Sequence, residues 1–111
     1  MDNETMKAVV RFRDERNWRQ FHNPKDLAIS ISIEAAELLE VFQWSGQDTD
    51  AADKLDKIKE ELADVMIYSM LMSDRLGLDV DEIVMDKLRK NSEKYEVEKA
   101  YGNSKKYTEL R

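Results

Sequence analysis

Four acidic residues lie in two pairs with a spacing of three, Glu34 with Glu37 and Glu61 with Asp64. In a helix, residues three apart project from nearly the same side, so each pair presents two neighbouring carboxylates. Both pairs lie among Leu, Ile, Val and Met, where an ionised side chain without a partner is costly to bury. We therefore expect these four carboxylates to hold a divalent cation.

The spacing of these pairs is weak support by itself, and their surroundings matter more. Seven acidic pairs in the chain share it, whereas the composition predicts about five by chance. Glu34 falls in an apolar seam that runs from Leu27 to Val41, and Asp64 lies within the apolar run at 62–72. The alternative is an acidic rim at an interface, paired with Lys or Arg.

The ligand types favour one class of metal. Ligands that are all carboxylates suit Mg²⁺ or Mn²⁺ better than zinc. A di-iron bundle would need Glu-x-x-His on two helices. The chain has one histidine, His22, which precedes Pro24 outside such a motif. We expect it to pack or cap there, and a role in a pocket is the alternative.

The sequence predicts four helices, at about 4–21, 24–44, 51–76 and 79–100. The second and third of them carry the two acidic pairs. The start signals are Asn23-Pro24 and Asp79 followed by Glu82, and Gly77 is a stop signal. No segment alternates as a strand does, so we predict an all-α fold, a four-helix subunit in an oligomeric bundle. Residues 1–100 would form the domain and residues 101–111 a C-terminal tail. We expect the third helix to be buried on several sides from Leu62 onward. In the fourth helix, the residues expected to face inward are Ile83, Val84, Leu88 and Tyr95.

The composition limits the partners. The chain has 111 residues, enough for one domain, and long helices in so small a chain often complete their core in an oligomer. The net charge of −6 argues against binding a nucleic-acid polymer or a membrane surface. There is no cysteine, and the polar amino terminus does not read as a signal peptide, so we expect a cytoplasmic protein.

Five ordered motifs resemble a known family. They are FRDERNW (12–18), QFHNP (20–24), EAAELLEVFQW (34–44), EELADVMIY (60–68) and KLRKNSEKY (87–95). In this order they resemble the MazG-like all-α nucleoside triphosphate pyrophosphohydrolases, closest to the dCTP pyrophosphatase branch, as does KKYTEL (105–110). The resemblance implies a Mg²⁺-dependent enzyme that cleaves a nucleoside triphosphate to the monophosphate and pyrophosphate, assembled as a dimer or tetramer.

The resemblance also implies roles for single residues. The catalytic metal ligands would be Glu34, Glu37, Glu61 and Asp64. The nucleotide would be held by Trp18 and Trp44 at the base, Tyr68 in the pocket, and Asn91 with Lys87 and Lys94 at the sugar and phosphates.

The sequence departs from the pattern of the dCTP branch at one position that concerns recognition of the base. The dCTP branch leads us to expect a histidine at the position of Val9, and valine cannot hydrogen-bond a base edge. Cytosine selectivity therefore does not follow from the resemblance, and base-modified deoxynucleotides are further candidates. Two other functions stay open, a non-catalytic helical dimerisation module and hydrolysis of a non-nucleotide pyrophosphate.

Overall fold

The computed structural model of the chain describes residues 3–110, which are mostly helical and contain no strand. The α-helices are α1 (Asn3–Glu15), α2 (Pro24–Glu40), α3 (Leu55–Arg75), α4 (Val80–Lys94) and α5 (Val97–Ala100). Three short 3₁₀ helices are η1 (Trp18–Phe21), η2 (Ala52–Lys54) and η3 (Tyr107–Glu109). The all-α prediction is confirmed. The chain forms two compact units that divide after Leu78, and each is described by itself.

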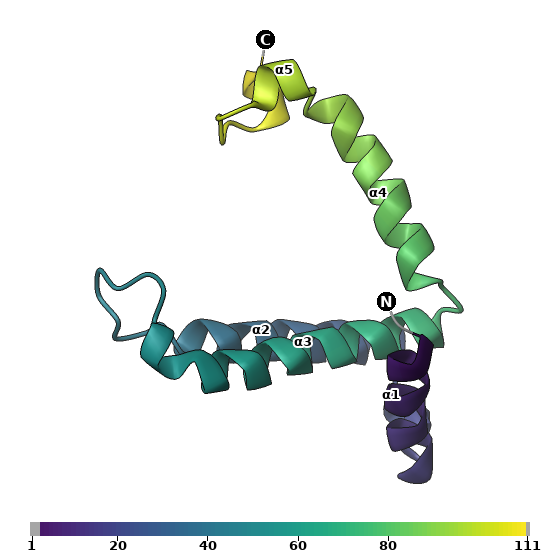
Figure 1. The fold of residues 1–111 in the computed structure, drawn as a ribbon. Coiled ribbons are helices and arrows are strands. Elements are labelled where there is room, and N and C mark those ends of the chain that lie inside the picture. Colours follow the sequence, from purple (N-terminus) through teal and green to yellow (C-terminus); the bar gives the residue numbers. More distant parts are fainter. Residues whose placement is uncertain (1–2, 111) are drawn as a thin grey trace. The chain divides into compact units, whose positions relative to one another are not determined.

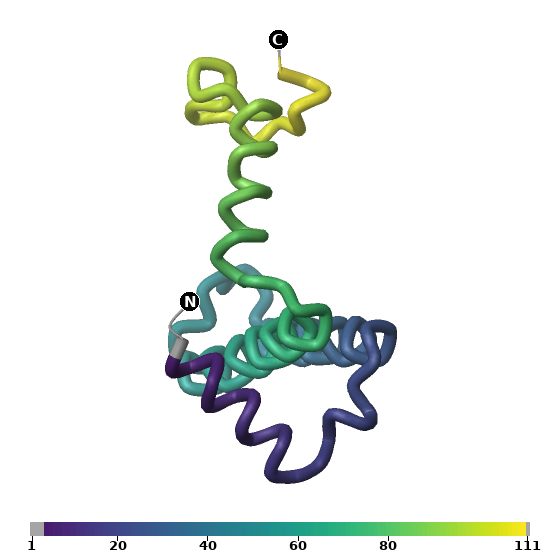
Figure 2. The backbone as a smooth tube through the Cα atoms, turned by 90° about the vertical axis from the view of Figure 1, so that its right-hand side faces the viewer, coloured from purple at the N-terminus to yellow at the C-terminus, as the bar shows by residue number. Residues whose placement is uncertain are grey.

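In the first unit, α2 and α3 form a hairpin and lie side by side (Figures 1 and 2). Its core includes Leu27 from α2 and Met70 and Leu71 from α3, all at most 5% exposed. Apolar burial of this kind is the main force that holds two such helices together. The hairpin therefore fixes which residues of α2 and α3 face one another.

The predicted helix signals at three termini are confirmed. Asn23 caps α2, because its side-chain oxygen accepts a hydrogen bond from the Asp26 backbone at 2.8 Å. Asp79 caps α4 in the same way. Gly77 ends α3 with φ +67°, and the Leu78 N–H donates to the Ser73 carbonyl at 2.8 Å. This bond satisfies a carbonyl at the helix end that has no partner within the helix.

The helix boundaries predicted between these signals are wrong in the first unit. The first helix ends at Glu15, not near Phe21, since Asn17 adopts a left-handed conformation with φ 54°. The second ends at Glu40, not near Trp44, and turns follow it. The third begins at Leu55, not near Ala51, because Ala51 is buried with φ 44°.

Helix α1 is attached to α3 through a buried charge. Arg13 is 3% exposed, and its Nη1 donates to the Asp74 carboxylate at 2.7 Å. Its Nε donates to Asp14 of its own helix at 2.9 Å. Two of the three guanidinium nitrogens are thus paired with carboxylates, which offsets the cost of burying the cation.

Two expected buried surfaces are exposed in the single chain. Leu62 and Met66 of α3 are 41% and 47% exposed, so α3 is not buried on all the sides that the sequence suggested. In the second unit, the residues that the predicted fourth helix was expected to turn inward are exposed as well: Ile83, Val84, Leu88 and Tyr95.

The second unit consists of α4, α5 and η3. Helix α4 ends at Lys94, not near Ala100 as predicted, and α5 is a separate short helix. The chain turns back, so that Tyr107 packs edge-on against Tyr95 at 6.0 Å between ring centroids. A single domain over 1–100 with a tail over 101–111 stays a prediction. Within residues 3–110, no helix combines the length and apolar character needed to cross a membrane.

We predict that Asp74→Ala lowers the free energy of unfolding by about 1–3 kcal/mol, because it leaves a buried guanidinium partly unpaired. Asp14→Ala removes the other partner, whose side chain is 52% exposed, and should cost less. Urea denaturation measures both. Equal losses for the two variants would show that burial of the Arg13–Asp74 pair does not increase its contribution to the free energy of unfolding.

Candidate functional site

Three of the four predicted carboxylates converge where α2 and α3 meet. Glu34 comes from α2, and Glu61 and Asp64 from α3, and each offers an oxygen within 4.8 Å of the other two. The two residues of α3 lie on one face because they are three positions apart. Glu34 reaches them because it lies on the face of α2 that meets α3. We call these three residues the carboxylate cluster.

The carboxylate cluster has the chemistry of a cation site. Glu61 is 6% exposed, and Glu34 and Asp64 are half-buried. One oxygen of Glu34 and one of Glu61, Oε2 in each, are buried and accept no hydrogen bond within the described chain. Such oxygens are costly unless a cation or donor meets them. The cluster can therefore hold a metal ion that prefers oxygen ligands.

Glu37, the fourth predicted ligand, lies outside the group of three, but members of that group shift its pKa. A hydrogen bond with Glu34 and the charge of Glu34, with a smaller effect from Glu61, raise the pKa of Glu37 to about 7. Two nearby carboxylates resist carrying two negative charges, so one retains its proton to a higher pH.

A lysine partly neutralises the cluster. Lys57 Nζ lies 2.9 Å from Oε1 of Glu61, one turn away on α3. The hydrogen bond and charge of Lys57 lower the pKa of Glu61, in spite of its burial. Glu61 is thus the ionised member of the Glu37–Glu61 pair.

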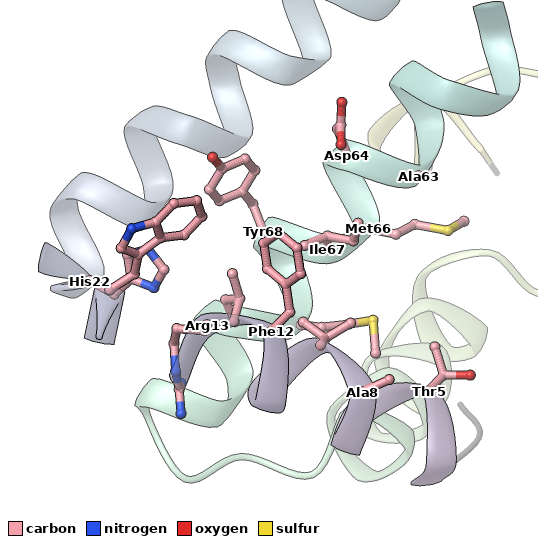
Figure 3. A pocket seen from close by; sticks show the side chains of 14 residues that line it. Thr5, Ala8, Phe12, Arg13, His22, Ala63, Asp64, Met66, Ile67 and Tyr68 are labelled. Carbon is pink, nitrogen blue, oxygen red and sulfur yellow. The ribbon is translucent and has the colours of Figure 1, made fainter. Parts of the chain in front are cut away.

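A cavity of about 800 Å³ adjoins the cluster through Asp64 (Figure 3). Its walls come from α1, η1 and α3 and are mostly apolar. The lining residues are Thr5, Ala8, Val9, Phe12, Arg13, Trp18, His22, Ala63, Asp64, Met66, Ile67, Tyr68, Met70 and Leu71. In Figure 3, Phe12, Ile67 and Tyr68 surround the space, and the Asp64 carboxylate points away from Phe12. The predicted pocket residues Trp18 and Tyr68 both line it.

The aromatic wall is held by local contacts. The Trp18 and Phe12 rings meet edge to face at 5.7 Å between centroids. The Arg16 guanidinium lies 3.6 Å from the centroid of the Phe12 ring. Trp18 is nevertheless 43% exposed, so a flat ligand has access to its ring.

The other predicted substrate residues belong to the turn after α2 and to α4. Trp44 is 87% exposed in the turn after α2 and does not line this cavity. Lys87, Asn91 and Lys94 are on α4 in the second unit, where the Lys94 ammonium lies 4.8 Å from the centroid of the Tyr107 ring. Their substrate roles stay predictions.

Two polar residues in the cavity wall are not among the predicted site residues. Arg13 lines it, but its charge is used by Asp74 and Asp14. His22, expected to pack or cap with a pocket role as the alternative, is also in the wall, and burial together with the charge of Arg13 lowers its pKa. The usable signal was the position of Arg13, which shares a helix face with Val9 and so falls among apolar neighbours.

The Glu37 pKa predicts how stability depends on pH without metal. A carboxyl whose folded pKa is raised stabilises the fold below its usual value of 4.5, and this contribution is lost as the pH rises toward 7. The lowered pKa of Glu61 changes the free energy of unfolding only below about pH 4.5, where protonation of this carboxylate removes its stabilising contribution. In EDTA, Glu37→Gln should therefore gain stability relative to wild type between pH 4.5 and 7.5.

Urea denaturation across this pH range measures the difference between variant and wild type, which removes the contribution of His22 from the comparison. Glu40→Gln, one turn further along α2, serves as the control and should follow the wild-type curve. A constant difference between Glu37→Gln and wild type would mean that Glu37 titrates normally.

Comparison with known proteins identifies the family of this chain. The sequence matches the MazG-like family over residues 29–110. It is 35% identical over 105 residues to dCTP pyrophosphatase 1 of Mus musculus and 36% identical over 104 residues to that of Homo sapiens. These alignments cover 89% of this chain and 61% of each relative, so the chain spans about three-fifths of their length.

A solved structure is similar over nearly its whole length. The crystal structure of a pyrophosphatase from Archaeoglobus fulgidus has a TM-score of 0.77 and 41% sequence identity to this chain. The match covers 84% of this chain and 90% of that one. These matches confirm the resemblance inferred from the motifs, and the chain belongs to the MazG-like family.

Proposed function

We propose that the chain is a Mg²⁺-dependent pyrophosphohydrolase that cleaves a nucleoside triphosphate and water to a monophosphate and pyrophosphate. The observation that carries the proposal is the carboxylate cluster beside an aromatic-walled cavity, joined through Asp64. The relatives named dCTP pyrophosphatase 1 and the solved pyrophosphatase support the same class of reaction.

The proposed ligands are Glu34, Glu61 and Asp64, joined by Glu37. Oxygen-only ligation suits Mg²⁺, and Mn²⁺ fits the same ligands. A bound divalent cation orients the triphosphate and neutralises charge that develops as pyrophosphate leaves. The two unpartnered oxygens of Glu34 and Glu61 favour this assignment over an acidic rim paired with Lys or Arg.

In the proposed reaction, water attacks the α-phosphorus and forms a new P–O bond. The bond from that phosphorus to the oxygen bridging to the β-phosphorus breaks, and pyrophosphate departs with its electrons. The chain positions the reactants. Trp18 offers a face for the base, Tyr68 adds a hydroxyl to the wall, and the apolar walls keep bulk water from the base. Lys87, Asn91 and Lys94 are proposed contacts for sugar and phosphates.

The cavity bears on the choice of base. Val9 is in its wall, so no hydrogen bond reaches a base edge from that position. The proposed substrates are nucleoside and deoxynucleoside triphosphates, including dCTP and base-modified deoxynucleotides. The aromatic wall favours a flat base over a non-nucleotide pyrophosphate, and the cavity itself argues against a purely structural dimerisation module. Assembly as a homodimer or homotetramer remains part of the proposal.

We predict release of pyrophosphate and monophosphate from at least one member of a panel of dNTPs and NTPs with Mg²⁺. Asp64→Asn should lower kcat/KM by about a hundredfold or more, because a stabilising charge is lost from the reaction centre. Asp56→Asn, an exposed position on the same helix, is the matched control. Folded wild-type protein that turns over no nucleotide would refute the proposed function.

Base recognition predicts a different kinetic change. Trp18→Ala should raise KM by between about fivefold and a hundredfold, as expected for a lost stacking contact, with a smaller change in kcat. Trp44→Ala tests whether that exposed ring also contacts the base, as the family resemblance implies. Steady-state kinetics on the best substrate measure both variants. An unchanged KM for Trp18→Ala would show that Trp18 does not contact the base.

A further inference from the structure

Lys57 occupies a position that the proposed reaction does not yet use. Its ammonium is 2.9 Å from Oε1 of Glu61, while Oε2 of the same carboxylate is buried without a partner. The Lys57 side chain is 60% exposed and that of Glu61 only 8%. One end of the ion pair is therefore fixed inside the carboxylate cluster. The other end lies in solvent, where Lys57 Nζ is also 3.8 Å from Oε2 of the exposed Glu60.

Lys57 also borders a second, polar cavity of about 510 Å³. This cavity lies between the end of α2 and the start of α3, and is distinct from the aromatic-walled one. Its lining residues are Glu37, Glu40, Val41, Lys54, Lys57 and Glu61. Lys54 is anchored there, because its Nζ donates to the Val41 carbonyl at 3.2 Å.

We propose that Lys57 is the counter-ion of Glu61 until a divalent cation binds, and then turns into the polar cavity to bind a phosphate oxygen of the substrate. This inference rests on the proposed function and adds a positioning residue and a phosphate subsite to it. The subsite takes the pyrophosphate part of the nucleotide, which becomes the leaving group.

Charge is the reason for the exchange. A divalent cation at the carboxylate cluster takes over neutralisation of Glu61 and repels the neighbouring ammonium. Lysine carries its charge on a flexible four-carbon stem, so Lys57 can leave Glu61 without moving the backbone of α3. The ammonium and the cation therefore compete for one carboxylate.

The charges of the polar cavity impose an order on binding. Its lining carries three carboxylates and two ammonium groups, which by itself disfavours an anion. A divalent cation offsets the carboxylates, and Lys57, no longer held by Glu61, presents its positive charge beside Lys54. Pyrophosphate should therefore bind with the metal and not without it.

The test uses Lys57→Met, which keeps the stem and removes the charge, with Lys59→Met as the matched control. Lys59 is exposed on the same helix and lines neither cavity. Isothermal calorimetry measures Mn²⁺ binding alone, and then inorganic pyrophosphate binding with saturating Mg²⁺. No turnover is needed for either readout.

We expect opposite effects in the two titrations. Lys57→Met should bind Mn²⁺ about threefold to fivefold more tightly, the range expected for losing a competing exposed ion pair. It should bind pyrophosphate with Mg²⁺ at least about fivefold more weakly, since a charge-assisted contact is lost. Lys59→Met should match wild type in both titrations.

Each other outcome overturns the inference. Unchanged binding in both titrations would make Lys57 a surface residue, and weaker binding in both would make it a structural support of Glu61. If wild type hydrolyses nucleotides while Lys57→Met behaves as wild type, only this inference fails. If wild type binds no Mn²⁺ and hydrolyses nothing, the proposed function fails with it.

Discussion

The contact between α2 and α3 forces like charges together, and the chemistry of this protein depends on that constraint. Burial of Leu27, Met70 and Leu71 drives the two helices side by side, and the same packing brings Glu34 against Glu61 and Asp64. Carboxylates this close repel one another. The fold tolerates them because apolar burial outweighs the repulsion and because nearby groups offset some of the charge.

The protein reduces this repulsion in two visible ways, and both leave the cluster suited to a cation. Glu37 keeps a proton to near neutral pH, and Lys57 pairs with Glu61. Neither satisfies the buried oxygens of Glu34 and Glu61. A divalent cation would coordinate those oxygens and would also remove the repulsion. The same excess of negative charge would therefore limit the stability of the cation-free cluster and favour metal binding.

Short-range features of the fold were predictable, and features that depend on packing were not. Asn23, Gly77 and Asp79 act within a few residues of their own positions, so their capping roles followed from residue type. The early end of α1 and the late start of α3 depend on left-handed backbone at Asn17 and Ala51. Such conformations are uncommon for non-glycine residues, and the surrounding structure must support them.

By itself, the sequence determined the helical class, the family and the acidic residues worth suspecting, because these follow from periodicity, residue order and the cost of placing charge among apolar neighbours. Only the tertiary structure decided which three carboxylates converge, that Arg13 is paired with Asp74, and that His22 joins Trp18 and Tyr68 in one wall. These are contacts between helices. They depend on how α1, α2 and α3 pack against one another, which no spacing along a single helix specifies.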